Sequence, residues 1–359
     1  VIPLFKLFTK TKIVFYCHHP EKLLVQYNEN RSNKLKKFYR SILDYFEEIT
    51  TLVCDQLLVN SEYTQKIVYK HFKKLNQTNL KPKVVYPAIN INQFNIEHEN
   101  VNLSDSNLMN RRITFLSINR YERKKGINIA IESLNKLYNI LKKENKSTTH
   151  IKLIIAGGYD TRVKENIEYY DELINLCKEY QLTYQELKNF THNDYKDGYY
   201  LLDNNKIKDV NIYFVTKFPD HQKIQLLKEC SVVLYTPINE HFGIVPIEAM
   251  LAGKPVIAMN SGGPLETIIN KETGYLCDNN VNTWANAMKQ FVDTNNLSHK
   301  MGLKGKQRVI DKWSRNKLKN EMKIVNDVVN SNIVTPLHLK LQSYCFVIIL
   351  FIIFIILVP

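Results

Sequence analysis

Several motifs that identify common enzyme classes are absent from this chain of 359 residues. It has no G-x-G-x-x-G after a run typical of a strand, and no G-x-x-x-x-G-K-[ST], so neither a nicotinamide or flavin site nor P-loop chemistry is supported. A G-x-S-x-G elbow for acyl transfer is missing as well. The six cysteines include no C-x-x-C pair, and no His or Cys pair has zinc spacing. Dispersed single cysteines favour a reducing compartment over a disulfide framework.

Glycine and proline are scarce, at 11 residues each, which excludes a collagen-like or low-complexity chain. A hydrophobic content of 44% excludes a wholly disordered protein. Positive charge is plentiful: 49 Lys and Arg against 35 Asp and Glu give a net charge of +14, so we expect an anionic partner. By charge alone this could be nucleic acid, a phospholipid surface or a phosphorylated small molecule. No segment combines basic residues with the aromatic stacking positions of a known nucleic-acid module, so we expect no nucleic-acid partner.

The two ends of the sequence differ in character. The chain begins with Val1 and not with Met, which suggests a fragment. Residues 1–17 lack the pattern of a signal peptide. Residues 346–358 are thirteen apolar residues without a charge, so we expect a hydrophobic membrane segment over 344–359, spanning or re-entrant, with a buried core element as the alternative. A terminal helix and basic linker, 316–343, precede it. Its lysines place the body of the protein in the cytosol by the positive-inside rule.

Alternating β-type and helical runs predict an α/β fold with parallel sheets covered on both faces. We expect one Rossmann-like domain over 106–315, with a low-complexity insertion at about 183–209, and an N-terminally incomplete Rossmann-like domain over 1–105. The predicted strands of the larger domain are residues 113–118, 151–157, 211–215, 231–236 and 255–259, with helices from Gly126, Val163, Asp220 and Pro246. In the first domain the strands are 12–17, 54–60 and 84–87, with a helix over 32–48 and Ser61 as the N-cap of the next one.

The most informative stretch is residues 236–264, TPINEHFGIVPIEAMLAGKPVIAMNSGGP. Pro246 is tolerated in a first helical turn, so the amides from about Gly243 to Val245 form an anion site at the carboxyl end of a strand. Glu240 and Glu248 form an E-x7-E pair near it. Carboxylates beside a phosphate more plausibly hold hydroxyl groups of a sugar or ribose, although Glu248 in the first turn could simply complement the helix dipole.

Three smaller features lie at other predicted strand ends. Residues 117–126, SINRYERKKG, concentrate Arg120, Arg123, Lys124 and Lys125 in one turn, either as a cationic clamp on a diphosphate or as a solvated basic loop. Gly157 and Gly158 permit a close backbone approach after the next strand. His18 and His19 end a strand of the first domain, where a histidine is either structural or in contact with a donor.

Together these motifs resemble the retaining glycosyltransferases of the GT-B fold that share E-x7-E. The longer runs FYCHHP, LVNSEYT, SINRYERKKG, LYTPINEHFGIVPIEAM and MNSGGPLE resemble the mannosyltransferases of the eukaryotic dolichol pathway within that family. The resemblance covers about residues 1–330 except the insertion. The first domain of that family begins with a glycine-rich loop, and we expect this sequence to start after it.

The resemblance implies two Rossmann-like domains facing a cleft and transfer of mannose from GDP-mannose, with retention, to a dolichol-pyrophosphate-linked Man-GlcNAc2 acceptor. It implies an enzyme at the endoplasmic reticulum membrane that faces the cytosol, needs no metal, and works beside other early dolichol-pathway transferases. Alternatives are another lipid-directed transferase with a different nucleotide sugar, or an inactive membrane scaffold. The implied roles are: Arg120 and Lys125 on the pyrophosphate, Glu248 on the ribose, Glu240 on the mannose, His18 facing the sugar, and Gly157, Gly158, Phe242, Gly243, Ile244 and Val245 completing the donor site.

Overall fold

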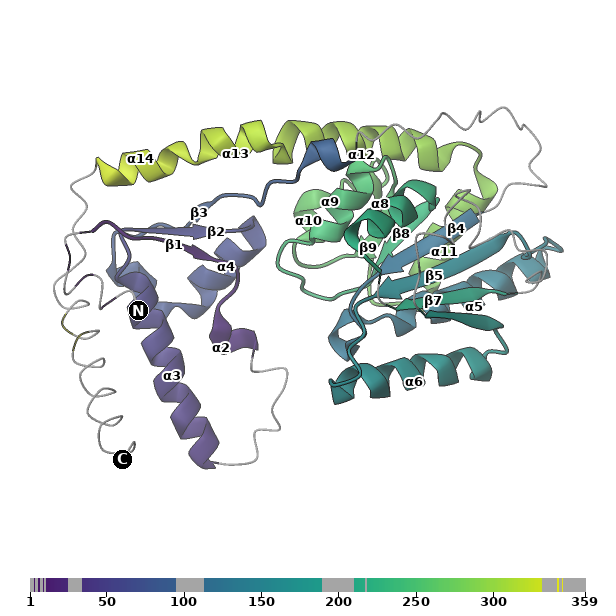
Figure 1. Ribbon diagram of the computed structural model, residues 1–359, viewed down its shortest axis with the longest axis horizontal. Helices are drawn as coiled ribbons and strands as arrows, with labels where there is room; N and C mark the ends of the chain where they lie inside the picture. Colours follow the sequence, from purple (N-terminus) through teal and green to yellow (C-terminus); the bar gives the residue numbers. More distant parts are fainter. Residues whose placement is uncertain are drawn as a thin grey trace. The chain divides into compact units, whose positions relative to one another are not determined.

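The computed structural model describes residues 11–24, 34–94, 113–188, 210–216 and 218–330, together with residues 3, 6, 9, 341 and 344. Its contacts divide the chain into two units, one made of Val1–Ala88 with Arg315–Pro359 and the other of Ile89–Ser314. Figure 1 shows both units, with labels on many of their helices and strands. Because the last helices belong to the first unit, that unit is built from the two ends of the sequence.

The larger unit contains a seven-stranded, all-parallel sheet in the order β10-β9-β8-β4-β5-β7-β6. Each residue of its five central strands is buried, as near-continuous apolar runs indicate for a sheet covered on both faces. The predicted α/β class is confirmed. These five strands match the predicted ones to within one residue: β4 (Ile113–Ile118), β5 (Ile151–Gly157), β7 (Ile212–Thr216), β8 (Val232–Tyr235) and β9 (Val256–Met259).

The two edge strands of this sheet were not predicted from the sequence. β6 (Tyr184–Lys188) and β10 (Gly274–Cys277) close the sheet on either side. The predicted insertion over 183–209 is therefore wrong at its beginning, and its remainder, 189–209, lies outside the described residues. The run YQELK of β6 is mostly polar, because an edge strand pairs on one side only and is less enclosed than the strands at the centre.

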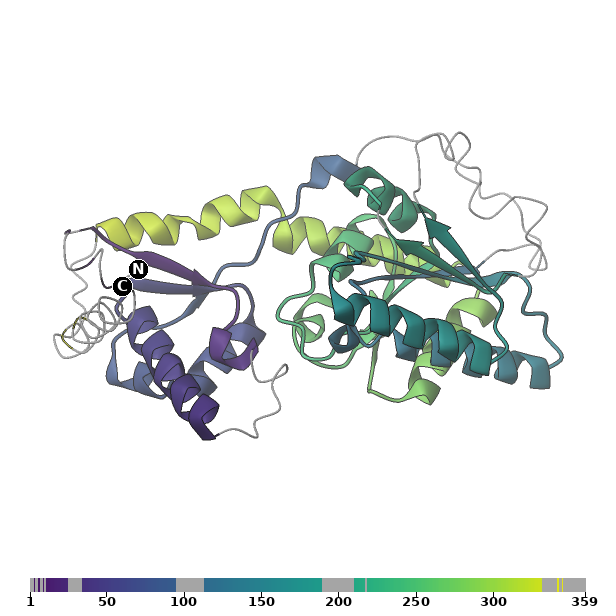
Figure 2. The same ribbon diagram turned by 60° about the horizontal axis from the view of Figure 1, so that its bottom comes forward.

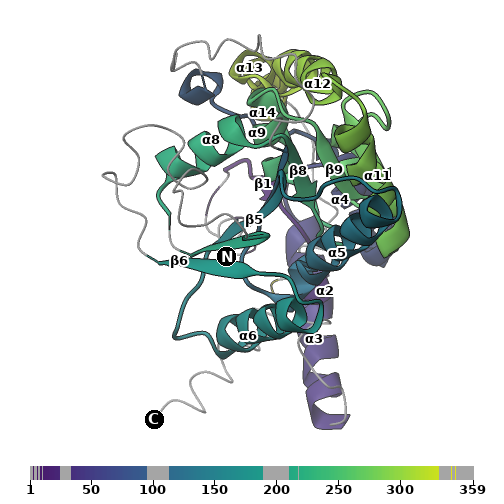
Figure 3. The same ribbon diagram turned by 90° about the vertical axis from the view of Figure 1, so that its right-hand side faces the viewer.

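Helices cover both faces of this sheet, as Figure 3 shows: α5, α6 and α11 lie along one face, and α8 and α9 on the other. α12 packs against α9. The main core joins α5, α6 and α11 to the strands through buried aliphatic and aromatic side chains such as Leu134, Leu173 and Trp284. The bounds are α5 (Asn128–Lys143), α6 (Lys164–Glu179), α8 (Asp220–Glu229), α9 (Ile244–Leu251), α10 (Pro264–Thr267), α11 (Val281–Asp293), α12 (Leu297–Trp313), η3 (Ile91–Phe94) and η5 (Arg123–Lys125).

The direction in which the sheet is built reverses between β4 and β8. On one side of β4 the sheet continues with β5, β7 and β6. β8 comes after them in the chain, pairs with the other side of β4 and leads on to β9 and β10. Ligands of open α/β sheets bind beyond the carboxyl ends of the strands at such a switch point. The turns that follow β4 and β8 are therefore the first place to look for a site.

The smaller unit has three parallel strands in the order β1-β2-β3. Figure 2 shows α3 and α4 on one side of these strands and α14 along the other. α3 continues four residues beyond its predicted end, to Leu52, and its predicted start at Ser32 lies outside the described residues. The bounds are β1 (Val14–Cys17), β2 (Gln56–Val59), β3 (Lys83–Val84), α2 (Glu21–Leu24), α3 (Lys34–Leu52), α4 (Glu62–His71), η2 (Lys73–Gln77), α13 (Arg315–Glu321) and α14 (Lys323–Val329).

Two local predictions for this unit have different outcomes. Ser61 is the N-cap of α4, as expected, and its hydroxyl accepts a hydrogen bond from the amide of Thr64 at 2.9 Å. The predicted hydrophobic segment 344–359 lies outside the described residues apart from Tyr344. Within the described ranges, no helix has both the length and the apolar character needed to cross a membrane.

Candidate active site

The turn after β4 carries the expected cationic cluster, and its backbone is held against the turn after β5. The amide of Tyr121 donates to the carbonyl of Gly158 at 3.2 Å. A Cβ added to Gly157 would lie only 1.7 Å from the carbonyl oxygen of Asn119, so this close approach of the two turns requires glycine. Arg120 lies between these contacts, and its backbone position is therefore fixed by β5.

The side chain of Arg120 remains accessible. It is 65% exposed, and its Nη1 lies 3.0 Å from Oε1 of Glu122. The other oxygen of Glu122 lies 3.1 Å from Nζ of Lys124. Glu122 is only 13% exposed, but Arg120 faces solvent, where water screens the ion pair, so an anion can draw Arg120 away.

Lys125 and Glu240, from the turns after β4 and β8, meet at the switch point. The ammonium of Lys125 donates to Oε2 of Glu240 at 2.6 Å, and both side chains are largely shielded, at 15% and 22% exposed. The backbone is tied at the same place, because the hydroxyl of buried Thr236 donates to the carbonyl of Lys125 at 2.6 Å. Two turns that are 115 residues apart thus form one structural unit.

The charge state of Glu240 follows from its neighbours. Burial acts to raise the pKa of Glu240, but the charge and hydrogen bond of Lys125, with His241 and Lys124, lower it below the usual value for a glutamate. Burial and the nearby Glu240 raise the pKa of Tyr235, which stays neutral. Glu240 is therefore an anion at neutral pH, and it can accept hydrogen bonds but cannot donate a proton.

The amino end of α9 directly follows the loop that holds Glu240, and its first amides are open to a ligand. Gly243 is the N-cap, with φ of 82° in the left-handed region, and no side chain caps the helix. Among the described residues no hydrogen bond occupies the amides of Gly243, Ile244 and Val245. The side chain of Phe242 is buried and lies edge-on to the Trp313 ring, with 6.3 Å between centroids. The helix end thus has the donors that an anion needs.

The NSGGP loop, residues 260–264, forms hydrogen bonds to the loop after β8, which holds Glu240. The amide of Gly263 donates to the carbonyl of Glu240 at 2.7 Å, and the hydroxyl of Ser261 accepts from the amide of Asn239 at 3.0 Å. A Cβ on Gly262, which has φ of 66°, would collide with the same carbonyl of Glu240. The glycine pair is therefore needed to pack the two loops together.

Glu248 differs from the expectation in one respect. It is the fifth residue of α9, and no acidic residue lies in the first turn, so complementing the helix dipole there is not its role. The helix begins two residues before Pro246, which the first turn tolerates at its third position. Oε1 of Glu248 accepts a hydrogen bond from Nζ of Lys223 at 2.7 Å, whereas its Oε2 is buried without a hydrogen-bond partner in the described part of the chain.

Comparison with known sequences identifies the family. The sequence pattern of the family "Glycosyl transferases group 1" matches residues 102–308. The chain is 41% identical over 324 residues to the alpha-1,3/1,6-mannosyltransferase ALG2 of Dictyostelium discoideum, covering 87% of this chain and 69% of the relative. It is 42% identical over 314 residues to ALG2 of Mus musculus, covering 87% and 67%. The chain belongs to the ALG2 mannosyltransferase family.

Solved structures agree on the fold of this ALG2 family member. A sucrose-phosphate synthase from Thermosynechococcus elongatus has a TM-score of 0.64 at 18% identity, covering 91% of this chain and 70% of that one. Anabaena HepE, in complex with UDP and glucose, also has a TM-score of 0.64, at 16% identity, covering 90% and 74%. The predicted GT-B fold is confirmed, and the chain is a retaining glycosyltransferase of the ALG2 family.

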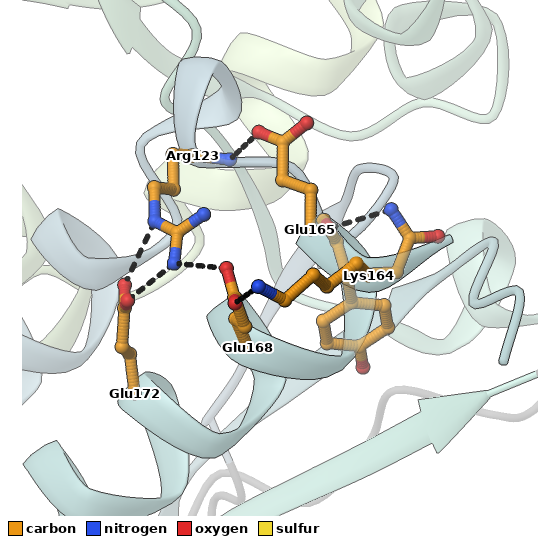
Figure 4. Close-up of polar contacts among 7 residues, drawn as sticks. Arg123, Lys164, Glu165, Glu168 and Glu172 are labelled. Carbon is orange, nitrogen blue, oxygen red and sulfur yellow. Dashed lines mark hydrogen bonds and ion pairs between the residues drawn. The ribbon is translucent and has the colours of Figure 1, made fainter. Parts of the chain in front are cut away.

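The four cations of the β4 turn have different partners, so a clamp formed by all four, one of the two alternatives expected from the sequence, is not what the turn forms. Figure 4 shows Arg123 turned toward α6, where its Nη2 lies 2.6 Å from Glu172 and 3.3 Å from Glu168. The amide of Arg123 donates to Glu165 at 3.2 Å. Arg123 therefore forms exposed ion pairs with α6, and Lys124 pairs with Glu122, as Arg120 does. Lys125 is the cation of this turn that pairs with Glu240, and the binding roles of Arg120 and Lys125 stay predictions.

His18 lies in the smaller unit, at the end of β1. Its side chain is exposed, and its ring lies edge-on to Tyr16, with 4.9 Å between centroids. The hydroxyl of Thr64 lies 3.4 Å from its carbonyl oxygen. These contacts hold the backbone and one edge of the ring and leave the side chain open to solvent.

Three residues of the candidate site were not singled out from the sequence. Thr236 was the last residue of a predicted strand, Glu122 was overlooked among the cations of its turn, and Lys223 was one polar residue of a predicted helix. For Thr236, its place at the carboxyl end of a strand next to β4 is a usable signal. Lys223 has none, because its pairing depends on how α8 packs against α9.

Proposed function

We propose that this ALG2 family member transfers mannose from GDP-mannose, with retention at the anomeric carbon, to the dolichol-pyrophosphate-linked Man-GlcNAc2 core of the N-glycan precursor. The relatives' name, alpha-1,3/1,6-mannosyltransferase, supports the sugar and the linkages. The observation that carries the proposed donor site is the shielded pair of Lys125 and Glu240 at the switch point of the sheet.

In this proposal the diphosphate of the donor is bound by Arg120, Lys125 and the amides of Gly243, Ile244 and Val245. When the bond between the anomeric carbon and the phosphate oxygen breaks, negative charge develops on the diphosphate. Fixed cations and amide dipoles stabilise that charge without reorganising. The acceptor hydroxyl forms the new bond to the anomeric carbon, and its proton passes to the departing phosphate oxygen.

The remaining roles concern hydroxyl groups and shape. Glu240, as an anion, accepts a hydrogen bond from a mannose hydroxyl and opposes the positive charge that develops on the sugar ring. Glu248 accepts from the ribose through its unoccupied Oε2. Gly157 and Gly158 allow the ligand to approach the backbone, and His18, from the smaller unit, contacts the donor sugar.

We further propose that transfer needs no divalent metal, because Arg120, Lys125 and the end of α9 supply the positive charge a metal would otherwise supply. The reaction then continues in excess EDTA. The acceptor lipid supports a place at the endoplasmic reticulum membrane with the two units facing the cytosol, where other early dolichol-pathway transferases would be its neighbours.

The test is a transfer assay on the full-length gene product, extracted from membranes and supplied with GDP-mannose and a lipid-pyrophosphate-linked Man-GlcNAc2 acceptor. Glu240→Ala should lower transfer by about 100-fold or more, since it removes an interaction with the transition state. Glu272→Ala is the matched control, because Glu272 is an exposed glutamate in a turn of the same unit. Unfolding temperatures of both variants separate lost chemistry from lost folding.

Competition between nucleotides identifies the donor. GDP should inhibit the reaction and UDP should not. Preference for UDP would favour another lipid-directed transferase with a different nucleotide sugar. Tight GDP binding without any transfer would move the proposal toward a different acceptor or an inactive scaffold.

A further inference from the structure

We propose that Lys223 is a positioning residue for the donor site: it holds the Glu248 carboxylate so that Oε2 faces the ribose hydroxyls of the nucleotide. The inference rests on the proposed function, since it takes the ligand of Glu248 to be the ribose. It adds a residue of α8 to a site otherwise built from the turns after β4, β5 and β8.

The contact between the two side chains is close and shielded. Nζ of Lys223 donates to Oε1 of Glu248 at 2.7 Å, and the side chains are 25% and 13% exposed. Charge-assisted hydrogen bonds are shorter and stronger than neutral ones, so this contact restricts the carboxylate to one orientation. Lys223 comes from the first turn of α8, which packs against α9, and the pair therefore joins two helices on the same face of the sheet.

The second oxygen of Glu248 is the informative one. Oε2 is buried and has no hydrogen-bond partner among the residues that the structure describes. A buried acceptor without a partner is costly in free energy, so it calls for a donor from outside the chain, such as a water or a ligand hydroxyl. An ionised carboxylate with one oxygen fixed by Lys223 presents its other oxygen in a defined direction, which suits a hydroxyl donor.

Electrostatics gives Lys223 a second task. Burial raises the pKa of Glu248, and the nearby Asp220 raises it further, whereas the hydrogen bond and charge of Lys223 oppose that rise. Without the ammonium, the carboxyl would be buried next to one like charge and no opposite charge. It would then take up a proton more readily and lose acceptor strength, so the position and the charge of Glu248 both depend on Lys223.

The experiment compares GDP with 2′,3′-dideoxy-GDP, which keeps the base and the diphosphate and lacks both ribose hydroxyls. Binding of each is measured by calorimetry on the full-length protein, on Lys223→Met and on Lys223→Arg. Lys223→Met should weaken GDP binding by about 10-fold or more and leave dideoxy-GDP binding within about 2-fold of the unmodified protein. Lys223→Arg, which keeps the charge and a donor, should restore most of the GDP affinity. Lys228→Met, a partly buried lysine of the same helix, is the matched control.

The outcomes separate this inference from the proposed function. Equal weakening of GDP and dideoxy-GDP by Lys223→Met would overturn it, because that is the result of a general structural defect. Unchanged GDP affinity in Lys223→Met would overturn it too. If the unmodified protein binds GDP and dideoxy-GDP equally, Glu248 does not serve the ribose and the inference fails while the donor assignment stands. If it binds no GDP at all, the proposed function itself fails.

Discussion

Replacing Gly157 with alanine tests whether the cationic turn is positioned by the strand beside it. The added Cβ would lie 1.7 Å from the carbonyl oxygen of Asn119, whereas real Cβ contacts are essentially never closer than 3.0 Å. The obstacle is backbone, so the turn after β4 must move by at least about 1.3 Å. Arg120 directly follows Asn119 in this turn and moves with it. A misplacement of about 1 Å in a catalytic site can cost about 100-fold in rate, and overpacking of this kind costs about 1–3 kcal/mol of stability.

We therefore expect Gly157→Ala to lower mannose transfer by about 100-fold while the protein still unfolds cooperatively at a moderately lower temperature. The adjacent glycine is the matched control, because a Cβ on Gly158 would meet only Cγ of Arg120, at an ordinary 3.5 Å. Gly158→Ala should keep the unfolding temperature of the unmodified enzyme, because the turn after β4 does not have to move. A loss of GDP affinity in this variant reports instead on the approach of the ligand to the backbone at Gly158. Transfer rates, GDP affinities and unfolding temperatures of the two variants are compared side by side. Full activity of Gly157→Ala, or an equal fall in unfolding temperature in both variants, would refute the reasoning.

Two further pairs of variants test the turn after β4. Thr236→Val leaves the partly buried carbonyl of Lys125 without its donor, so we expect a loss of about 1–3 kcal/mol, or about 2–12 °C in unfolding temperature, together with weaker GDP binding. Thr267 is equally buried, but its hydroxyl lies 3.5 Å from its acceptor, so Thr267→Val should change little. Arg120→Gln should reduce GDP affinity about 10-fold or more. The ion pairs of Arg123 are exposed and face α6, so Arg123→Gln should alter stability by no more than about 1 kcal/mol and leave transfer intact. Equal effects of the two arginine variants on GDP affinity would contradict the assignment.

The central strands were predictable because a parallel sheet covered on both faces leaves its central strands no exposed side. Such strands read as unbroken apolar runs, and β4 and β5 match the predicted limits at both ends. The same reasoning fails at the edges. β6 carries Gln185, Glu186 and Lys188 in a run of five residues, because a strand at the edge of the sheet is less enclosed. Composition alone cannot distinguish such a strand from the polar stretch that follows it.

The location of the candidate site could be predicted from the ends of the strands, but the contacts between its side chains could not. Topology brings the carboxyl ends of parallel strands to one edge, so the turns holding Arg120 and Glu240 could be assigned to one place before any coordinates. Which cation meets which carboxylate could not. Arg123 and Lys125 are two residues apart in one turn, yet Arg123 pairs with α6 and Lys125 with Glu240. That difference depends on the direction of each side chain in η5, and no charge pattern encodes it.

The two glutamates of E-x7-E show how one motif can supply two different carboxylates. Each is paired with a single lysine, and in each pair one oxygen is engaged: Lys125 binds Oε2 of Glu240, and Lys223 binds Oε1 of Glu248. Both carboxylates are largely buried, so burial acts to raise both pKa values.

The surroundings then separate the two glutamates. Lys125, His241 and Lys124 act together to lower the pKa of Glu240 below its ordinary value, whereas Asp220 adds to the rise at Glu248. A group whose pKa is depressed in the folded state stabilises the fold above its ordinary pKa and loses that contribution only as pH falls through the lower value. The charge on Glu240 is therefore secure at neutral pH, as an interaction with a positively charged transition state requires. The pKa of Glu248 is raised, so its charge is less strongly favoured than that of Glu240. Glu248 therefore suits a neutral hydroxyl, whose charge does not change during transfer.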